Sequence, residues 1–336
     1  MVLHTGGVER ELPAEEVLSR LNALYMACQR CPKEPGLDKG ASFSDLAVGI
    51  GGLKRCSACG RAPLDLVMVE AMEVLVDHNL RSRSDPLRSI GWPLVEVGFP
   101  IAYPPRLGPK ELIIIGEHLT KEAAAEIVAK VPEVKGVIRS GGVPGVSDLR
   151  AAPTRWELLA GSDLRCDVVS SLIGELVIYK HQSKIHVEFP RQFAPKMKIL
   201  EELYFRGKLT SVADVLAGPG TLGLMAALAG AELVVLNDAW LPAVEDAILN
   251  LEANRSILGI ERIERPETPA SEIGGEPVLA AEAVGDACKI EVYFGDAERL
   301  FSRAEPVDLC LVDPFPGMNF DRIAGACRVC GEIVIV

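Results

Sequence analysis

The chain has 336 residues, a hydrophobic fraction of 49% and a mean hydropathy of +0.22, which exclude an intrinsically disordered protein and allow two or three domains. Its net charge of −12 argues against a simple nucleic-acid binder, because such proteins usually carry a strong basic excess. No apolar stretch reaches membrane-spanning length, and no basic region precedes an apolar run near the N-terminus. We therefore expect a cytoplasmic protein without membrane contact, whose nine cysteines are thiols or metal ligands.

The N-terminal region contains two C-x-x-C pairs, Cys28 with Cys31 and Cys56 with Cys59. Each pair places two thiolates on one tight turn, and two such turns supply the four soft ligands of a tetrahedral structural zinc site. The segment between the pairs is rich in glycine and polar residues, so it has little capacity to form a core without a metal. We therefore predict a zinc-binding module over residues 1–63.

The middle segment, 64–190, alternates helix and strand patterns. Apolar residues recur at helical spacing over 64–80, and a second helix is expected between the capping Thr120 and Pro132. We expect strands in three stretches that are rich in strand-forming residues: 111–119, 134–140 and 166–189. This order predicts an independent α/β domain.

The segment 212–224, VADVLAGPGTLGL, places an apolar run and an aspartate before three glycines in G-x-G-x-x-G spacing. Its surroundings predict a strand, a glycine turn, a helix and a strand, which is the context of a nucleotide-type site. Gly218 and Gly220 would let the backbone approach a ligand closely. Asp214 would repel a pyrophosphate but suits a ligand with a positive amino group and no phosphate. S-adenosylmethionine (SAM) is such a ligand.

Three further aspartates are expected at the ends of later strands. Asp238 ends the next strand, where a carboxylate can accept hydrogen bonds from ribose hydroxyls, and Asp296 and Asp313 follow two more apolar runs. Ligands of open parallel sheets bind along the carboxyl edge of the strands. We therefore predict that these three residues and Asp214 line the cofactor site, with helix capping as the structural alternative for each of them.

This ordered set of motifs, over 191–336, resembles the class I SAM-dependent methyltransferases. The resemblance implies a Rossmann-like sheet in a methyltransferase domain at 191–336, and an enzyme that transfers a methyl group from SAM. The DPF sequence that begins at Asp313 and Pro314 is similar to the fourth motif of amino-group methyltransferases acting on bases, including the tRNA guanine-26 dimethyltransferases. It implies that these two residues position the nitrogen that is methylated.

The layout of 111–336 is similar to that of the archaeal-type tRNA guanosine-37 N1-methyltransferases and their wybutosine-pathway relatives. The segments that carry this resemblance are LIIIGEHLTKEAAAEIVAKVPEVKGVIRSGGVPGVSDLRAAPTRWELLAG and KIHVEFPRQFAPKMKILEEL. It implies that tRNA is the partner, that a guanine nitrogen is methylated and that the middle domain binds RNA. The family has a catalytic arginine before the LAG segment, and Arg150 and Arg155 are both within reach of that position. Spacing does not choose between them.

The sequence departs from this family at two positions. Pro195 stands where the family has its general-base glutamate, and Asp313 replaces the asparagine that opens the fourth motif. Glu188, Glu201 and Asp313 are the alternative bases. Two other functions therefore stay open: a SAM-dependent methyltransferase of a small metabolite or protein, and a catalytically inactive methyltransferase-like binding subunit.

Near the C-terminus, residues 259–286 are acidic and interrupted by proline and glycine, so we expect a long surface loop above the cofactor edge. The final GEIVIV predicts the fifth strand, after which no residues remain for the usual final hairpin. The open edge would then be covered by the N-terminal module or by a second subunit of a homodimer. Cys327-x-x-Cys330 lacks a partner pair, and we expect these cysteines to pack at a helix end.

Overall fold

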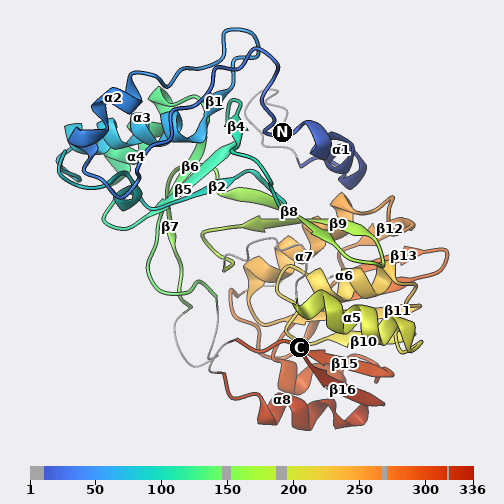
Figure 1. Cartoon of the computed structure of the whole chain (residues 1–336). Helices are drawn as coiled ribbons and strands as arrows, with labels where there is room; N and C mark the ends of the chain where they lie inside the picture. Colours follow the sequence, from blue (N-terminus) through green and yellow to red (C-terminus); the bar gives the residue numbers. More distant parts are fainter. Residues whose placement is uncertain (1–10, 146–152, 187–194, 267–270, 316–317) are drawn as a thin grey trace. The chain divides into compact units, whose positions relative to one another are not determined.

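The computed structural model describes residues 11–145, 153–186, 195–266, 271–315 and 318–336. The chain divides into two compact units, which are described separately here (Figure 1). The first unit contains Arg20–Val143 and Arg155–Arg165, and the second contains Val2–Ser19, Pro144–Thr154 and Cys166–Val336. None of the helices in the described ranges has the length and apolar character needed to cross a bilayer.

The first unit is built on a four-stranded sheet in the order β2–β5–β6–β7. The central strands β5 and β6 are parallel, and the outer strands β2 and β7 are antiparallel to them. These strands are β2 (Trp92–Val95), β5 (Leu112–Gly116), β6 (Val134–Arg139) and β7 (Glu157–Gly161). The helices α3 (Leu64–Asp77) and α4 (Lys121–Lys130) pack on each other, and α4 packs on β6 and β7. Thr120 caps α4 as predicted, because its hydroxyl accepts the Ala123 N–H at 3.3 Å.

The first unit also contains short elements: η1 (Leu21–Ala23), η2 (Phe43–Leu46), α2 (Ala47–Ile50), β1 (Ala62–Pro63), η3 (Leu87–Ile90), β3 (Val97–Gly98) and β4 (Arg106–Leu107). The two cysteine pairs lie between η1 and β1 in the sequence. Arg55 joins this region to the sheet and to α3. Its Nε lies 2.8 Å from Oε1 of Glu133, and its Nη1 lies 2.6 Å from Oε1 of Glu70. The cysteine region and the middle sheet thus share one compact unit. The three predicted domains, 1–63, 64–190 and 191–336, stay a prediction.

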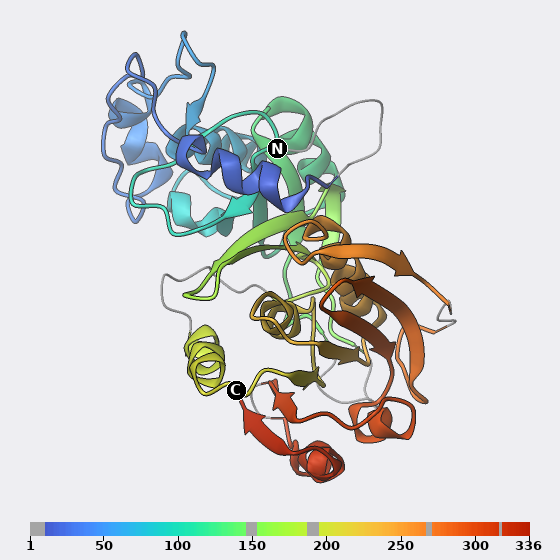
Figure 2. The same ribbon diagram turned by 90° about the vertical axis from the view of Figure 1, so that its right-hand side faces the viewer.

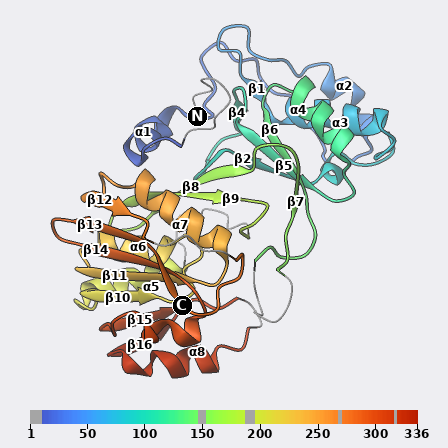
Figure 3. The same cartoon turned by 180° about the vertical axis from the view of Figure 1, so that it is seen from behind.

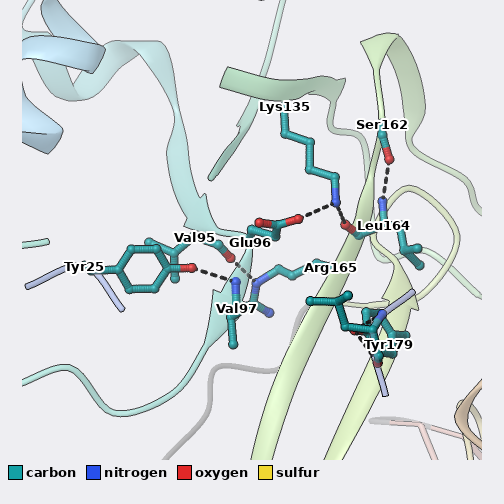
Figure 4. A network of polar contacts seen from close by, with 10 residues as sticks. Tyr25, Val95, Glu96, Val97, Lys135, Ser162, Leu164, Arg165 and Tyr179 are labelled. Atoms are coloured by element: carbon teal, nitrogen blue, oxygen red, sulfur yellow. Dashed lines mark hydrogen bonds and ion pairs between the residues drawn. The ribbon is translucent and has the colours of Figure 1, made fainter. Parts of the chain in front are cut away.

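A buried polar network supports the sheet of the first unit (Figure 4). The Lys135 ammonium donates to Oε1 of Glu96 at 3.0 Å and to the carbonyl of Leu164 at 2.8 Å. The Arg165 Nε donates to the carbonyl of Val95 at 2.9 Å. Lys135 is only 4% exposed, and a charge at that depth needs such partners to be tolerated.

The second unit contains a seven-stranded sheet in the order β12–β13–β14–β11–β10–β15–β16. Its strands are β10 (Ser211–Asp214), β11 (Leu233–Asp238), β12 (Ile260–Glu264), β13 (Val278–Gly285), β14 (Lys289–Phe294), β15 (Leu309–Val312) and β16 (Glu332–Ile335). The five strands from β14 to β16 are parallel. This parallel arrangement confirms the predicted Rossmann-like sheet.

Helices cover both faces of this sheet. One face carries α5 (Pro195–Phe205), α6 (Thr221–Leu228) and α7 (Leu241–Ala253), whose apolar side chains form one core cluster. The other face carries η4 (Ala297–Ser302), α8 (Asp321–Ala326) and η5 (Cys327–Val329). In Figure 1, α5 and α6 lie in front of β10 and β11, and Figure 3 shows the same sheet from behind.

The expectation of a surface loop over 259–286 is wrong. The structure places β12 and β13 there as an antiparallel pair that extends the sheet beyond β14, and the orange strands can be followed in Figure 2. Ala280, Ala281 and Ala283 are at most 3% exposed. Pairing with β14 therefore satisfies the backbone and buries the small apolar residues between the acidic ones, which composition alone does not reveal.

A hairpin packs on α7 in the second unit. The strands β8 (Leu164–Ser170) and β9 (Glu175–His181) form a hairpin, and α1 (Ala14–Arg20) lies near the start of the chain. The hydroxyl of Tyr179 on β9 binds the backbone N–H and carbonyl of Leu12 at 3.1 and 3.0 Å. These bonds attach the segment before α1 to β9.

A row of polar side chains on α7 completes the hydrogen bonds of β9. Asn250 accepts the N–H of Tyr179 at 2.7 Å and donates to its carbonyl at 3.0 Å. Asn254 does the same with Val177, at 3.0 and 2.7 Å. The spacing of four residues places both amides on one face of the helix. The helix therefore serves as an edge partner for the strand.

The edge at β16 is the outer strand of the sheet, and the described residues add no hairpin beyond it. The predicted homodimer through this edge stays a prediction. Cys327 is fully buried where α8 ends, in agreement with the expected packing at a helix end.

Candidate functional site

Four aspartates lie at the carboxyl edge of the parallel strands. Asp214 and Asp238 are the last residues of β10 and β11, Asp313 directly follows β15, and Asp296 follows β14 after one glycine. All four strands are parallel, so their carboxyl ends meet at one edge. The predicted placement of these residues is confirmed, and their roles toward a ligand stay a prediction.

The glycine turn lies between β10 and α6. Gly218 and Gly220 have φ angles of +53° and +87°, a backbone conformation that favours glycine. A Cβ at the third glycine, Gly223, would lie 2.1 Å from Cδ2 of Leu236 on β11. The first two glycines therefore shape the turn, and the third lets α6 lie directly on the sheet.

Asp214 is buried beside this turn, with 1% exposure, and its Oδ2 accepts the N–H of Gly223 at 3.2 Å. Burial raises the pKa of this carboxyl to about 7, and the nearby charge of Asp313 adds to the effect. Asp214 therefore changes its protonation state near neutral pH and responds to any charge placed at the edge.

Asp238 and Asp296 bind backbone groups. Asp238 accepts the N–H of Gly218 and of Trp240, each at 2.8 Å, so it holds the glycine turn against β11. Burial raises its pKa, and these backbone donors oppose the effect. Asp296 caps η4 by accepting the N–H of Glu298 at 2.9 Å. The capping alternative is thus realised for Asp296, although each carboxylate oxygen keeps a lone pair for a ligand.

Buried polar atoms without a hydrogen-bond partner gather around the glycine turn. Within the described ranges, they include Oδ1 of Asp214, Oγ1 of Thr221 and Oδ1 of Asn237. Buried polar atoms are usually satisfied, so several unpaired acceptors at one edge indicate a place where a ligand or water supplies the hydrogens. This donor-poor environment fits a ligand that carries N–H and O–H groups.

The DPF segment follows β15 at the same edge. The Lys196 ammonium of α5 lies 2.6 Å from Oδ2 of Asp313. The ring of Phe315 contacts His186 edge-on, with 5.3 Å between ring centroids. A Cβ at Gly145 would lie only 2.8 Å from Cζ of Phe315. Gly145 therefore lies against the aromatic ring, and it pairs with Thr154 through two backbone hydrogen bonds.

The structure describes only one of the two arginines that were predicted to be catalytic. Arg150 lies outside the described residues, as does the alternative base Glu188. Arg155 belongs to the first unit and lines a hollow of about 530 Å³ with Arg139 and His118, next to the carboxyl ends of β5 and β6. Glu201, the other alternative base, accepts the N–H of Leu172 at 2.8 Å in the β8–β9 turn.

The four N-terminal cysteines converge, with their sulfur atoms within 4.8 Å of one another. Sγ of Cys31 lies 3.7 Å from Sγ of Cys28 and 3.7 Å from Sγ of Cys59, and Cys28 lies 3.7 Å from Cys56. Four sulfurs around a zinc ion with Zn–S bonds of about 2.3 Å are about 3.8 Å apart. Backbone N–H groups of Cys59 and Ala58 lower the pKa of Cys56 to about 6. The cluster therefore fits zinc.

Sequence reasoning missed three contacts at or near the edge. It assigned no contact to Lys196, which pairs with Asp313, to His186, which contacts Phe315, or to Asn250, which donates to the Pro219 carbonyl of the glycine turn at 2.9 Å. Each contact joins segments that are distant in the sequence. The one available signal was the asparagine repeat on α7, at a spacing of four residues.

No protein-family model and no curated protein matches this sequence. Solved structures resemble it at low similarity, and three of them are as follows. TYW2 of P. horikoshii in complex with MeSAdo is 17% identical with a TM-score of 0.37, and the match covers 73% of this chain and 69% of that chain. The tRNA m1G37 methyltransferase of M. jannaschii is 16% identical with a TM-score of 0.34, covering 66% and 57%.

The third is the Pyrococcus abyssi tRNA (uracil-54, C5)-methyltransferase in complex with S-adenosyl-L-homocysteine. It is 14% identical with a TM-score of 0.40, covering 80% of this chain and 56% of that chain. This chain thus spans little more than half the length of two of the three proteins. At these values the similarities establish neither the fold nor the activity of this chain, and both rest on the sheet and the edge described above.

The sulfur geometry predicts that replacing Cys59 with serine releases the metal. A structural site with three thiolates binds zinc much more weakly, so we expect the purified variant to lose most of its zinc, measured by mass spectrometry of the metal. Cys288→Ser is the matched control, because Cys288 is a half-buried cysteine outside the cluster. Full zinc content in Cys59→Ser, or none in the wild type, would contradict the assignment.

Proposed function

We propose that this protein is a SAM-dependent methyltransferase that acts on a guanine nitrogen in tRNA. The assignment of SAM as the cofactor rests on the buried Asp214, which accepts the N–H of Gly223 at the carboxyl edge of a parallel sheet. A pyrophosphate at this turn would bring negative charge next to the carboxylate. SAM instead brings a sulfonium, an ammonium group and no phosphate. The charge at the edge therefore supports SAM over a dinucleotide.

The residues at the edge fit the parts of this cofactor. We infer that the ammonium group pairs with the unused Oδ1 of Asp214, directly or through a water molecule. Asp238 accepts hydrogen bonds from the ribose hydroxyls with its remaining lone pairs, and Gly218 and Gly220 let the chain pass close to the ligand. Asp296 lies beside them at the end of β14. When bound, SAM supplies an electrophilic methyl group.

The substrate assignment rests on the sequence resemblance of 111–336. The hollow near β5 and β6 is lined by Arg139 and Arg155 but also by Glu117 and Glu157, and Arg139 pairs with Glu157, so its charge is mixed. Asp313 and Pro314 form a turn that can accept an N–H of a planar base and aim its nitrogen at the methyl group. The net charge of −12 favours a second candidate, methylation of a small metabolite or protein.

Transfer of radiolabelled methyl groups tests this function. Wild-type protein is offered unmodified tRNA in one reaction and nuclease-treated cell extract in another. We expect label in tRNA, with a loss of at least about 100-fold in Asp313→Ala, since positioning groups of this kind contribute on that order. SAM binding by Asp313→Ala should stay within twofold in calorimetry.

The outcomes separate the alternatives. Label only in the nuclease-treated extract would move the protein to the metabolite or protein class. SAM binding without any transfer would favour an inactive binding subunit. Full activity of Asp313→Ala would remove Asp313 from the reaction.

The pKa of Asp214 predicts how SAM affinity depends on pH. An ammonium group pairs with the ionised carboxylate, so the proton that Asp214 holds below its pKa of about 7 must leave on binding. Affinity should therefore rise from pH 5.5 to 7, by up to about tenfold per unit, and then level off. Calorimetry in two buffers of different ionisation enthalpy should show proton release near pH 6.

The matched variant Asp214→Asn cannot release this proton. It should bind SAM weakly and without the pH dependence between 5.5 and 7. Equal proton release by the variant and the wild type would show that another group titrates.

A further inference from the structure

Lys196 makes the shortest ionic contact of the DPF segment. It lies in the first turn of α5, and its Nζ is 2.6 Å from Oδ2 of Asp313, across 117 positions of sequence. The two side chains are 36% and 21% exposed, so the pair is partly shielded from solvent at the edge. An ion pair that is partly withdrawn from water acts more strongly than one on an open surface.

We propose that Lys196 is a positioning residue of the methyl transfer: it holds Oδ2 of Asp313, so that Oδ1 of Asp313 is turned toward the substrate nitrogen and accepts its proton. This inference rests on the proposed function and assigns the base that the sequence leaves open. The substrate must then carry an N–H at the reacting position. A ring nitrogen without a hydrogen, such as N1 of adenine, offers no proton for Asp313 to accept.

The charges at the edge explain why Asp313 needs a cation. Asp214 on β10 is a like charge near Asp313, and its own pKa is raised to about 7 by burial and by Asp313. Asp238 on β11 adds a further negative charge, and His186 lies near Asp238. Two neighbouring carboxylates disfavour each other's ionised forms, and an adjacent ammonium offsets this effect. Among the described residues, Lys196 is a cation that contacts Asp313.

The geometry also gives the two oxygens of the Asp313 carboxylate different roles. Oδ2 is occupied by the ammonium of Lys196, and Pro314 restricts the backbone that follows Asp313. This arrangement leaves Oδ1 to accept a hydrogen bond from an incoming N–H. The carboxylate is thereby fixed as an acceptor before the substrate binds, which is how positioning lowers a barrier.

The proposed step balances. The N–H proton passes to Oδ1 of Asp313, and the electron pair that it leaves on nitrogen forms the new N–CH3 bond. The pair of the broken C–S bond stays on sulfur, which becomes the neutral thioether of S-adenosylhomocysteine. Asp313 then returns the proton to water when the products leave.

Single-turnover transfer with saturating SAM tests the role of Lys196, because it gives the maximal rate and the half-saturating substrate concentration separately. In Lys196→Met the Asp313 carboxylate loses the ammonium that orients it. We expect the maximal rate to fall at least about tenfold and the half-saturating substrate concentration to stay within about twofold, since the lost contact acts on the reacting geometry. Lys196→Arg should restore the wild-type rate, because it keeps the charge.

Lys198→Met is the matched control, since Lys198 is exposed on the same helix. It should leave the maximal rate and the half-saturating substrate concentration unchanged. Folding is followed by the thermal unfolding midpoint, and SAM binding by calorimetry, and both should be preserved in Lys196→Arg and Lys198→Met. These two readouts do not depend on activity.

Three outcomes would overturn the inference. An unchanged maximal rate in Lys196→Met would show that Asp313 needs no cation, and an equal loss in Lys196→Met and Lys196→Arg would indicate a merely structural role. If Lys196→Met does not fold, a Lys196→Arg variant that folds but does not keep the wild-type rate would contradict the proposal. A wild-type protein that binds SAM and transfers no methyl group would instead overturn the proposed function, and this inference with it.

Discussion

The carboxylate of Asp214 is buried at the end of β10, and the structure of the edge depends on this placement. Its contact with the Gly223 N–H ties the start of α6 to β10, the middle one of the five parallel strands. Burial keeps its pKa near neutrality, so the charge at the edge is adjustable rather than fixed. A ligand that brings a positive group stabilises the ionised form, and a ligand that brings phosphate opposes it.

The rest of the second unit holds this edge in place. Asp238 binds the turn from β11, and Asn250 binds it from α7 through the carbonyl of Pro219. Asn250 also pairs with the backbone of β9, so one buried amide connects the hairpin to the glycine turn. Losing a buried group of this kind costs about 1–3 kcal/mol for each partner left unpaired. The turn is therefore preorganised before any ligand arrives.

The sequence predicted the features that depend on local spacing. The two C-x-x-C pairs and the aspartates at strand ends follow from short motifs, and the structure brings each set together. It did not reveal β13, because alanines among glutamates resemble a loop until pairing with β14 buries them. Nor could it pair Lys196 with Asp313, since that contact exists only once α5 packs beside the sheet. Long-range partners of polar residues are the part that a single sequence leaves undetermined.

The most direct test of the central claim is a competition between two ligands for the glycine turn. Equilibrium dialysis at pH 7.5 would measure binding of labelled SAM in the presence of increasing concentrations of NAD. The charge of Asp214 predicts that SAM binds with one site per chain and that NAD at a large excess does not displace it. Displacement of SAM by NAD, or binding of NAD alone, would contradict the account of how this edge selects its ligand.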